Sequence, residues 1–126
     1  VKDTLKFLTK CSEIFRVCSE RGRQRIVLHG LTDLAEIAVL CANDHDVKLV
    51  SIIDPSSKLN RYAGIPIHSD FSNLNDFDAL IVTDLGSPQR EFDKLVKHYG
   101  VDCVFAPAIL KVSSELKSQV IGGDYV

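Results

Sequence analysis

The stretch RIVLHGLTDLAEIA, from Arg25 to Ala38, decides the fold that we expect for this chain. Its first five residues form a basic-then-apolar run typical of a buried strand, and the run breaks at Gly30. Apolar residues then recur at the i, i+3, i+4, i+7 spacing of one helix face, at Leu34, Ile37, Ala38 and Cys41. The stretch therefore predicts a strand, a tight turn and a helix.

A second apolar run, from Lys48 to Ile53, ends in the carboxylate of Asp54. In mononucleotide-binding βαβ units, an acidic residue at roughly this distance from the glycine turn binds the ribose hydroxyls. Asp54 is therefore a candidate ribose ligand. The alternative is an aspartate that forms the turn before Pro55.

The turn after the first strand departs from the dinucleotide fingerprint G-x-G-x-x-G. When Gly30 is aligned with the first glycine, Thr32 occupies the second position and Ala35 the third. Alanine is accepted at the third position, but Thr32 is bulky where the backbone must approach a pyrophosphate. A diphosphate at the helix N-terminus with the Thr32 hydroxyl as a donor is one alternative. The other is that Asp33 caps the helix and repels a phosphate.

Length and composition indicate one ordinary globular domain. A chain of 126 residues is too short for a catalytic domain beside a binding domain, and its 45% hydrophobic and 25% charged residues are typical values. No apolar run approaches the roughly twenty residues that span a bilayer, and no signal-peptide pattern is present. We therefore expect a cytoplasmic protein with no membrane partner.

Charge divides the chain into a basic entry segment and an acidic remainder. Up to Arg25 there are seven Lys/Arg and three Asp/Glu, a net charge of +4, whereas the remaining residues carry eight and fourteen, a net charge of -6. An acidic domain does not grip nucleic acid by itself. The charge division permits a basic neighbouring module to bind nucleic acid, and the absence of any Met indicates a fragment of a longer protein.

The entry segment, residues 1–24, is predicted to form a helix over about 3–20 with a weak heptad-like seam. We predict a linker or dimerisation helix, followed by a Rossmann-like domain over residues 25–126. The alternative is that this helix packs on the sheet of its own domain.

The later part of the chain predicts three further strands. Pro66 places a strand at 65–68 on a sheet edge, because proline cannot donate to a central ladder. Ser87 and Pro88 predict the start of a helix that ends at Gly100. The other expected segments are a short helix at 70–75, strands at 78–84 and 101–107, a helix containing Ile109, Val112 and Leu116, and a frayed tail at 121–126.

These elements predict a Rossmann-like, doubly wound α/β fold with a parallel five-stranded sheet in the order 3-2-1-4-5. A ligand crevice then lies at the carboxyl ends of the first and fourth strands, where the strand order reverses. The candidate binding residues at this crevice are Gly30, Leu31, Thr32, Asp33, Asp54, Thr83 and Ser87. Ser87 is also explained by its predicted role as a helix cap.

The sequence shows no arrangement typical of a catalyst. His29, His45, His68 and His98 are scattered, and neither a Ser/His/Asp motif, an H-E-x-x-H motif nor a P-loop is present. A solvated or hydrogen-bonded role is expected for His29. The four cysteines lack C-x-x-C spacing, which indicates buried thiols and predicts neither a metal site nor a disulfide framework.

The motif at residues 30–38, Asp54, the Gly-Ile-Pro-Ile turn at 64–67 and the strand at 78–83 resemble those of Rossmann-like sensory domains. Such domains follow MarR-type winged-helix modules associated with exopolysaccharide gene clusters, and residues 4–8 resemble their linker. The chain is also similar to the nucleotide-sugar-binding domain of sugar acetyltransferases. More distantly, it resembles the NAD-binding half of Rex-type repressors and CoA-binding-type domains of polysaccharide enzymes.

The resemblance implies a non-catalytic sensor domain of a bacterial transcriptional regulator, with Gly30, Thr32, Asp33 and Asp54 facing a nucleotide, a nucleotide-sugar or NAD. Thr32 departs from the glycine of the NAD-binding members. A homodimer is a further expectation. The alternatives are the nucleotide-sugar-binding part of an acyltransferase or dehydratase in polysaccharide biosynthesis, and a domain that binds nothing and only dimerises.

Overall fold

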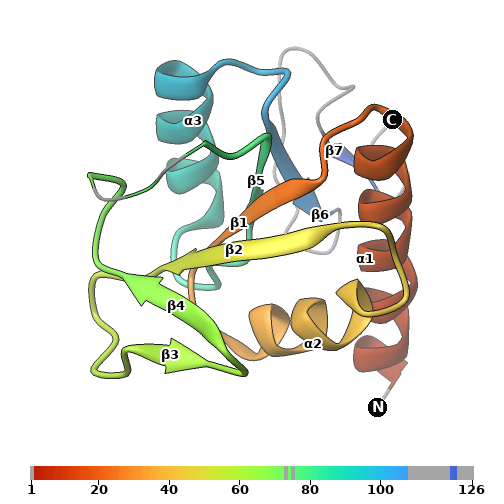
Figure 1. Cartoon of the computed structure of the whole chain (residues 1–126), viewed down its shortest axis with the longest axis horizontal. Coiled ribbons are helices and arrows are strands. Elements are labelled where there is room, and N and C mark those ends of the chain that lie inside the picture. Colours follow the sequence, from red (N-terminus) through yellow and green to blue (C-terminus); the bar gives the residue numbers. More distant parts are fainter. Residues whose placement is uncertain (1, 73, 75, 108–119, 122–126) are drawn as a thin grey trace.

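The elements form an open sheet with helices on both faces (Figure 1). The computed structural model describes residues 2–72, 74, 76–107 and 120–121. In chain order the elements are α1 (Lys2–Glu20), β1 (Arg25–His29), α2 (Asp33–Ala42), β2 (Lys48–Ile53), β3 (Arg61–Tyr62), β4 (Ile65–His68), β5 (Ala79–Val82), α3 (Pro88–Tyr99), β6 (Val104–Pro107) and β7 (Val120–Ile121).

The sheet is mostly parallel and has seven strands in the order β3-β4-β2-β1-β5-β6-β7. Only β3 runs antiparallel to its neighbour β4 among the described pairs. The prediction of an α/β fold is confirmed. The prediction of five strands in the order 3-2-1-4-5 was wrong in number and order, because the two-residue strands β3 and β7 flank the others. Segments this short carry no periodicity that sequence analysis can detect.

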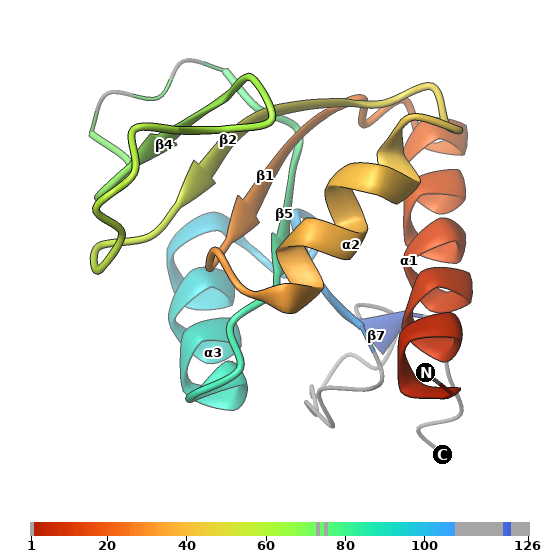
Figure 2. The ribbon, with the colours of Figure 1, turned by 90° about the horizontal axis from the view of Figure 1, so that it is seen from below.

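Alternation along the strands divides the core between the two faces of the sheet. Ile26 and Leu28 of β1 contribute to the cluster beneath α1 and α2, whereas Val27 contributes to the cluster beneath α3. All three side chains are fully buried, as expected for a central parallel strand. Figure 2 shows the two helix layers from below the sheet.

Helix α1 packs on α2 and on the sheet of its own domain. Ile14 and Phe15 have no exposed surface and belong to the same cluster as Phe105 of β6. This part of α1 therefore packs on the sheet of its own domain, as the alternative interpretation predicted. A role as linker or dimerisation helix stays a prediction. Among the described residues, no helix combines the length and hydropathy that a bilayer crossing requires.

The sheet edge next to β4 is closed by a tight hairpin. Ala63 and Gly64 have φ values of +52° and +81° and connect β3 to β4, as the two-residue hairpin turns require. Pro66 predicted that β4 lies at the edge, but β3 lies outside it. Pro66 lies opposite Arg61, and its carbonyl accepts a hydrogen bond from Ser51 Oγ at 3.2 Å.

Three further predictions need correction. Residues 70–72 form bends and a turn rather than a helix, because Asp70 accepts hydrogen bonds from the amide and hydroxyl of Ser72. The strand predicted from residue 101 begins at Val104, after a turn. Ile121 belongs to β7 rather than to a frayed tail.

Two predicted segments, the helix around residues 109–116 and the tail at 122–126, lie outside the described residues. The prediction of buried thiols is confirmed for Cys11, Cys18 and Cys41, whereas Cys103 is half-buried.

Candidate functional site

The carboxyl ends of β1, β2 and β5 meet around a hollow of about 540 Å³. Its walls come from residues 30–32 after β1, 54–56 after β2, 69–71 after β4 and 84–86 after β5, together with Glu91 and Lys94 of α3. We call this hollow the switch-point hollow, because the strand order reverses between β1 and β5. Ligands of open α/β sheets bind at such a position.

Gly30 lets the turn after β1 pass against the end of β5. Its φ is +116°, and a Cβ atom added there would lie 3.0 Å from the Cα and N atoms of Asp84. Its amide donates to the carbonyl of Ile53 at 2.8 Å. A residue with a side chain would strain the backbone and collide with the neighbouring loop.

Two threonines lock the turns after β1 and β5 together. Thr83 Oγ1 donates to the carbonyl of Gly30 at 2.6 Å, and Thr32 Oγ1 donates to the carbonyl of Thr83 at 2.6 Å. Thr32 Oγ1 also accepts from the Ala35 amide at 3.4 Å, so Thr32 is the N-cap of α2. The expectation that Asp33 is the cap was wrong. Asp33 is the first helical residue, is exposed, and does not line the hollow.

Asp54 is held against the glycine turn by backbone amides. Its Oδ2 accepts from the Leu31 amide at 2.9 Å, and its Oδ1 accepts from the amide and hydroxyl of Ser56 at 2.9 and 2.7 Å. Burial raises the pKa of Asp54, but the hydrogen bonds from Ser56, Leu31 and Ser57 outweigh it and hold the pKa below 3.8. Asp54 is therefore a charged residue that lines the hollow and also forms a turn, which combines both expectations.

Asp84 orders the second loop in a similar way. Its Oδ2 accepts from the Ser87 amide at 2.7 Å, three residues later. Ser87 is the N-cap residue of α3, as predicted, but its side chain makes no capping hydrogen bond. Thr83 is fully buried, and neither Thr83 nor Ser87 lines the hollow. Of the predicted site residues, the structure thus brings together Gly30, Leu31, Thr32 and Asp54.

His29 lies beneath the hollow in a partly apolar environment. Its ring stacks on Phe71 with centroids 5.9 Å apart, and its Nε2 lies 3.7 Å from Glu91 Oε1. Burial lowers the pKa of His29, while Glu91 and Asp84 oppose this shift. Its Nδ1 is buried and has no hydrogen-bond partner among the described residues. The expectation of a solvated or hydrogen-bonded ring was therefore wrong for this nitrogen.

A second hollow of about 640 Å³ shares four wall residues with the first: His29, Phe71, Glu91 and Lys94. Its other walls are Leu95, Lys97, His98 and Tyr99. We call it the α3 hollow. Sequence analysis missed Glu91 and Lys94, because it followed only the apolar face of α3, and it also missed Phe71 in the segment after β4. The i, i+3, i+7 spacing of Glu91, Lys94 and His98 is the signal that marks a polar stripe beside that face.

The two hollows differ in charge. The switch-point hollow contains the carboxylates of Asp54, Asp70, Asp84 and Glu91 with Lys94, whereas the α3 hollow contains two lysines and Glu91. An acidic wall attracts hydroxyl donors, and a basic wall attracts anions. Among the described residues, no cluster of three His, Cys, Asp or Glu side chains is placed to hold a metal ion.

Comparison with known proteins gives one distant relative to report. No protein-family model matches the chain, and no solved structure matches it significantly. The chain is similar to the 4-hydroxy-tetrahydrodipicolinate reductase of Streptococcus uberis, with 27% identity over 70 residues. The match covers 56% of this chain and 27% of the reductase, so the matched chain spans about a quarter of that relative.

Proposed function

We propose that this chain is a non-catalytic sensor domain that binds a nucleotide or a nucleotide-sugar at the switch-point hollow. One observation carries the proposal: Asp54, at the end of β2, and the Gly30 turn, at the end of β1, line a single hollow where the strand order reverses. This is the position at which α/β sheets bind nucleotides. The distant similarity to a reductase supports nucleotide binding in general.

Asp54 is placed to accept a ribose hydroxyl through Oδ2. Its Oδ2 carries one hydrogen bond, from Leu31, and a carboxylate oxygen accepts two. The negative charge that its lowered pKa preserves strengthens a hydroxyl donor's bond to it. A sugar therefore binds without breaking the contact that orders the turn.

The phosphate groups are directed away from the glycine turn. The carboxylate of Asp54 already occupies the Leu31 amide, and the Thr32 hydroxyl is committed to the Thr83 carbonyl. Lys94 and Lys97 supply positive charge in the adjoining α3 hollow. These contacts disfavour the dinucleotide-binding mode in which the pyrophosphate lies on the amides of the glycine turn.

Signal transmission is proposed to run through α1. In this proposal α1 packs on α2 and the sheet in two alternative ways, and the ligand binds one of them more tightly. Ligand binding therefore shifts α1 toward that packing and changes the orientation of a preceding DNA-binding module. In this proposal α1 acts as the linker or dimerisation helix of a transcriptional regulator, and the homodimer and a role in polysaccharide biosynthesis are parts of it.

The second candidate is the nucleotide-binding part of an enzyme, either a reductase or a sugar-modifying acyltransferase or dehydratase. The match to the reductase favours this candidate. His29 and Glu91, half-buried side by side in the wall between the hollows, would then face the reacting end of the ligand. Tight binding of NADH or NADPH, with no binding of nucleotide-sugars, distinguishes it from the sensor.

The test is a binding panel on the 126-residue chain with AMP, UDP-glucose, NAD and NADH, measured by thermal shift and calorimetry. We expect AMP or UDP-glucose to raise the Tm, since ligand at one hundred times its Kd adds about 2.7 kcal/mol to the stability. Asp54→Asn should weaken binding roughly tenfold, because the charged acceptor for a ribose hydroxyl is lost.

Asp102→Asn is the matched control. Asp102 is exposed in the turn before β6 and lines neither hollow, so this variant should bind like the parent chain. Binding that is equally weak in both variants, or a Tm that no ligand moves, contradicts the proposal.

A further inference from the structure

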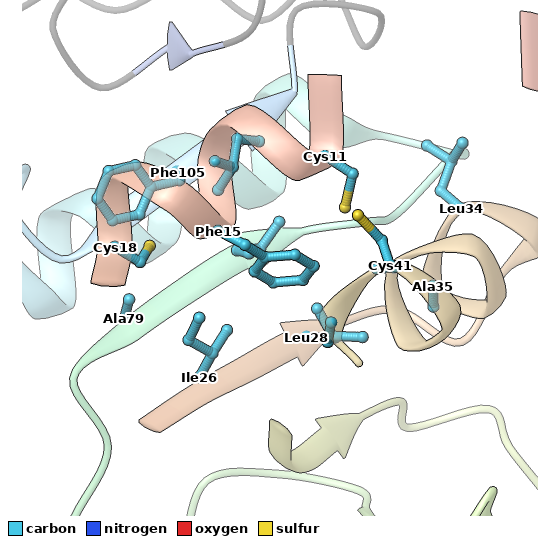
Figure 3. Close-up of a cluster of buried hydrophobic side chains, with 14 of the residues drawn as sticks. Cys11, Phe15, Cys18, Ile26, Leu28, Leu34, Ala35, Cys41, Ala79 and Phe105 are labelled. Atoms are coloured by element: carbon cyan, nitrogen blue, oxygen red, sulfur yellow. The ribbon is translucent and has the colours of Figure 1, made fainter. Parts of the chain in front are cut away.

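Two thiols face each other on the opposite side of the sheet from the α3 hollow. Figure 3 shows the sulfur atoms of Cys11, from α1, and Cys41, from α2, pointing toward one another. The two thiols form a hydrogen bond. Both belong to the cluster beneath α1 and α2, and neither contributes to the candidate nucleotide site.

One of the two cysteines lines a hollow at the surface. Cys41 is 5% exposed and lines a hollow of about 610 Å³ between α1 and α2, whereas Cys11 is fully buried behind it. The remaining walls of this hollow are Thr9, Ser12, Glu13, Arg16, Leu40 and Asp44. A small oxidant that enters from the surface therefore meets Cys41 first.

A hydroxyl and an imidazole give the Cys41 proton a route away from the sulfur. The Ser12 hydroxyl hydrogen-bonds to the Cys41 thiol, and its Oγ lies 2.7 Å from Nε2 of His45. His45 also contacts the ring of Phe15, with centroids 5.9 Å apart. With Ser12 donating to Nε2, its oxygen is free to receive the proton of Cys41.

The surroundings of the pair separate the two thiols by their acidity. The hydrogen bond from Cys11 lowers the pKa of Cys41; burial and Asp44 oppose this, Ser12 adds to it, and the pKa is about 7. The same hydrogen bond and burial raise the pKa of Cys11. Cys41 lies near the C-terminus of α2, where the helix dipole disfavours an anion, so the thiolate depends on these hydrogen bonds.

We propose that Cys41 is a peroxide-reactive thiol and that Cys11 resolves it into a disulfide that joins α1 to α2. In the first step the Cys41 thiolate attacks one oxygen of hydrogen peroxide. The S–O bond forms, the O–O bond breaks, and the departing hydroxide takes up a proton from His45 and becomes water. The sulfur loses two electrons to the peroxide and becomes a sulfenic acid.

In the second step the sulfur of Cys11 attacks the sulfur of Cys41. The S–S bond forms, the S–O bond breaks, and the leaving hydroxide takes the proton of Cys11 as a second water. The sum is two thiols and one hydrogen peroxide giving one disulfide and two waters. The link closes a loop between positions 11 and 41 and fixes α1 on α2.

The sequence makes the test direct, because trypsin places the four cysteines in four separate peptides: residues 11–16, 17–21, 26–48 and 98–111. The reduced 126-residue chain is treated with hydrogen peroxide, its remaining thiols are blocked with N-ethylmaleimide, and the digest is analysed without reduction. We expect peptides 11–16 and 26–48 to be joined, with the loss of two hydrogen atoms, and the other two to carry the blocking group.

Variants separate the roles of the two thiols. Cys11→Ser should leave a sulfenic acid on peptide 26–48 that dimedone traps, and Cys41→Ser should abolish the reaction. Cys18→Ser is the matched control and should form the same link, since Cys18 is fully buried and burial raises its pKa to about 12. Ser12→Ala should slow oxidation at neutral pH about fivefold, the effect of one pKa unit on the thiolate fraction of a thiol whose pKa is near 7, and the rate should recover at alkaline pH.

The peptide map of the parent chain needs no substitution and decides the proposal even if a variant fails to fold. A link between any other pair of peptides overturns it. So does oxidation of Cys18 or Cys103 at the rate of Cys41 in the folded chain, and so does the absence of a dimedone adduct in a folded Cys11→Ser variant.

Discussion

The two strand-turn-helix units at the switch-point hollow, β1–α2 and β5–α3, share the same order of elements but differ in the contacts that order their turns. In each, an aspartate carboxylate accepts a hydrogen bond from a backbone amide of the turn. In β5–α3 the carboxylate is Asp84, three residues before the Ser87 amide. In β1–α2 it is Asp54, which lies 23 residues after the Leu31 amide.

The N-termini of α2 and α3 also differ in whether distant or local groups order them. Thr32 caps α2 through its side chain and is tied to the backbone of β5, whereas Ser87 begins α3 without a capping side-chain bond. The β1–α2 turn therefore depends on groups distant in sequence, and the β5–α3 turn is ordered locally. A ligand that binds Asp54 therefore also acts on the β1–α2 turn, because the Asp54 carboxylate holds the Leu31 amide of that turn.

The glycines of the two turns should differ most in their response to substitution. Gly30→Ala should lower the free energy of unfolding by about 2–4 kcal/mol, because it combines a positive φ with a collision against the Asp84 backbone. In Gly86→Ala the nearest atom is Asp84 Oδ2 at 4.0 Å, so the change should stay within about 0.5 kcal/mol. Urea denaturation measures both, and equal losses would contradict the difference between the turns.

Removal of the side-chain hydroxyl from Thr83 or from Ser87 should give the next largest difference in stability between the two turns. Thr83→Val preserves the shape of a fully buried side chain but leaves the Gly30 carbonyl without its 2.6 Å donor, which should cost about 1–3 kcal/mol. Ser87→Ala removes a hydroxyl that makes no capping bond and should cost less than about 0.5 kcal/mol. A large loss for Ser87→Ala would show that the two helix starts are equivalent.

The carboxylate of Asp54 should give the β1–α2 turn an acid-sensitive stability. Because the hydrogen bonds hold its pKa below 3.8, its contribution is present above that pH and is lost as the pH falls through the lowered pKa. Asp54→Asn should therefore lower the stability by about 1 kcal/mol at neutral pH, and the difference from the parent chain should vanish in strong acid. Thermal unfolding followed from neutral pH to about pH 2 measures the effect. A difference that does not change with pH would contradict it.

His29, between the hollows, should have a smaller effect in a different pH range. Burial lowers the pKa of His29 below its ordinary value of 6.5 in the folded chain, so His29 is protonated more readily in the unfolded chain. The free energy of unfolding therefore falls as the pH drops through 6.5. His29→Phe retains the ring against Phe71 and should remove this slope. Thermal unfolding of the parent chain and the variant between about pH 5 and pH 8 measures the slope, and an unchanged slope in His29→Phe would contradict the prediction.

The helices and the central strands could be predicted because their information is local. The apolar periodicity of α2 and α3, the continuous apolar run of β5 and the serine-proline start of α3 each occupy a few adjacent residues. The strands β3 and β7 could not be predicted, because two residues have no periodicity and pair only once the rest of the sheet exists.

The candidate site was predictable in position and less so in detail. The glycine and Asp54 mark the switch point by their spacing, but the capping residue was assigned to Asp33 instead of Thr32. Both threonine and aspartate are common helix caps. Thr32 is held in place by its hydrogen bond to the carbonyl of Thr83, which is 51 residues away in the sequence. Phe71, Glu91 and Lys94 reach the hollows only through packing between distant segments.

The short outer strands also limit how copies of this chain can associate. Among the described residues, the sheet ends in β3 on one side and β7 on the other, each two residues long. An added strand would find few backbone groups to pair with, and so short an edge is a poor template for cross-β stacking. The described edges of the sheet therefore disfavour edge-to-edge aggregation. A specific dimer of the described part of the chain would have to form through helix surfaces.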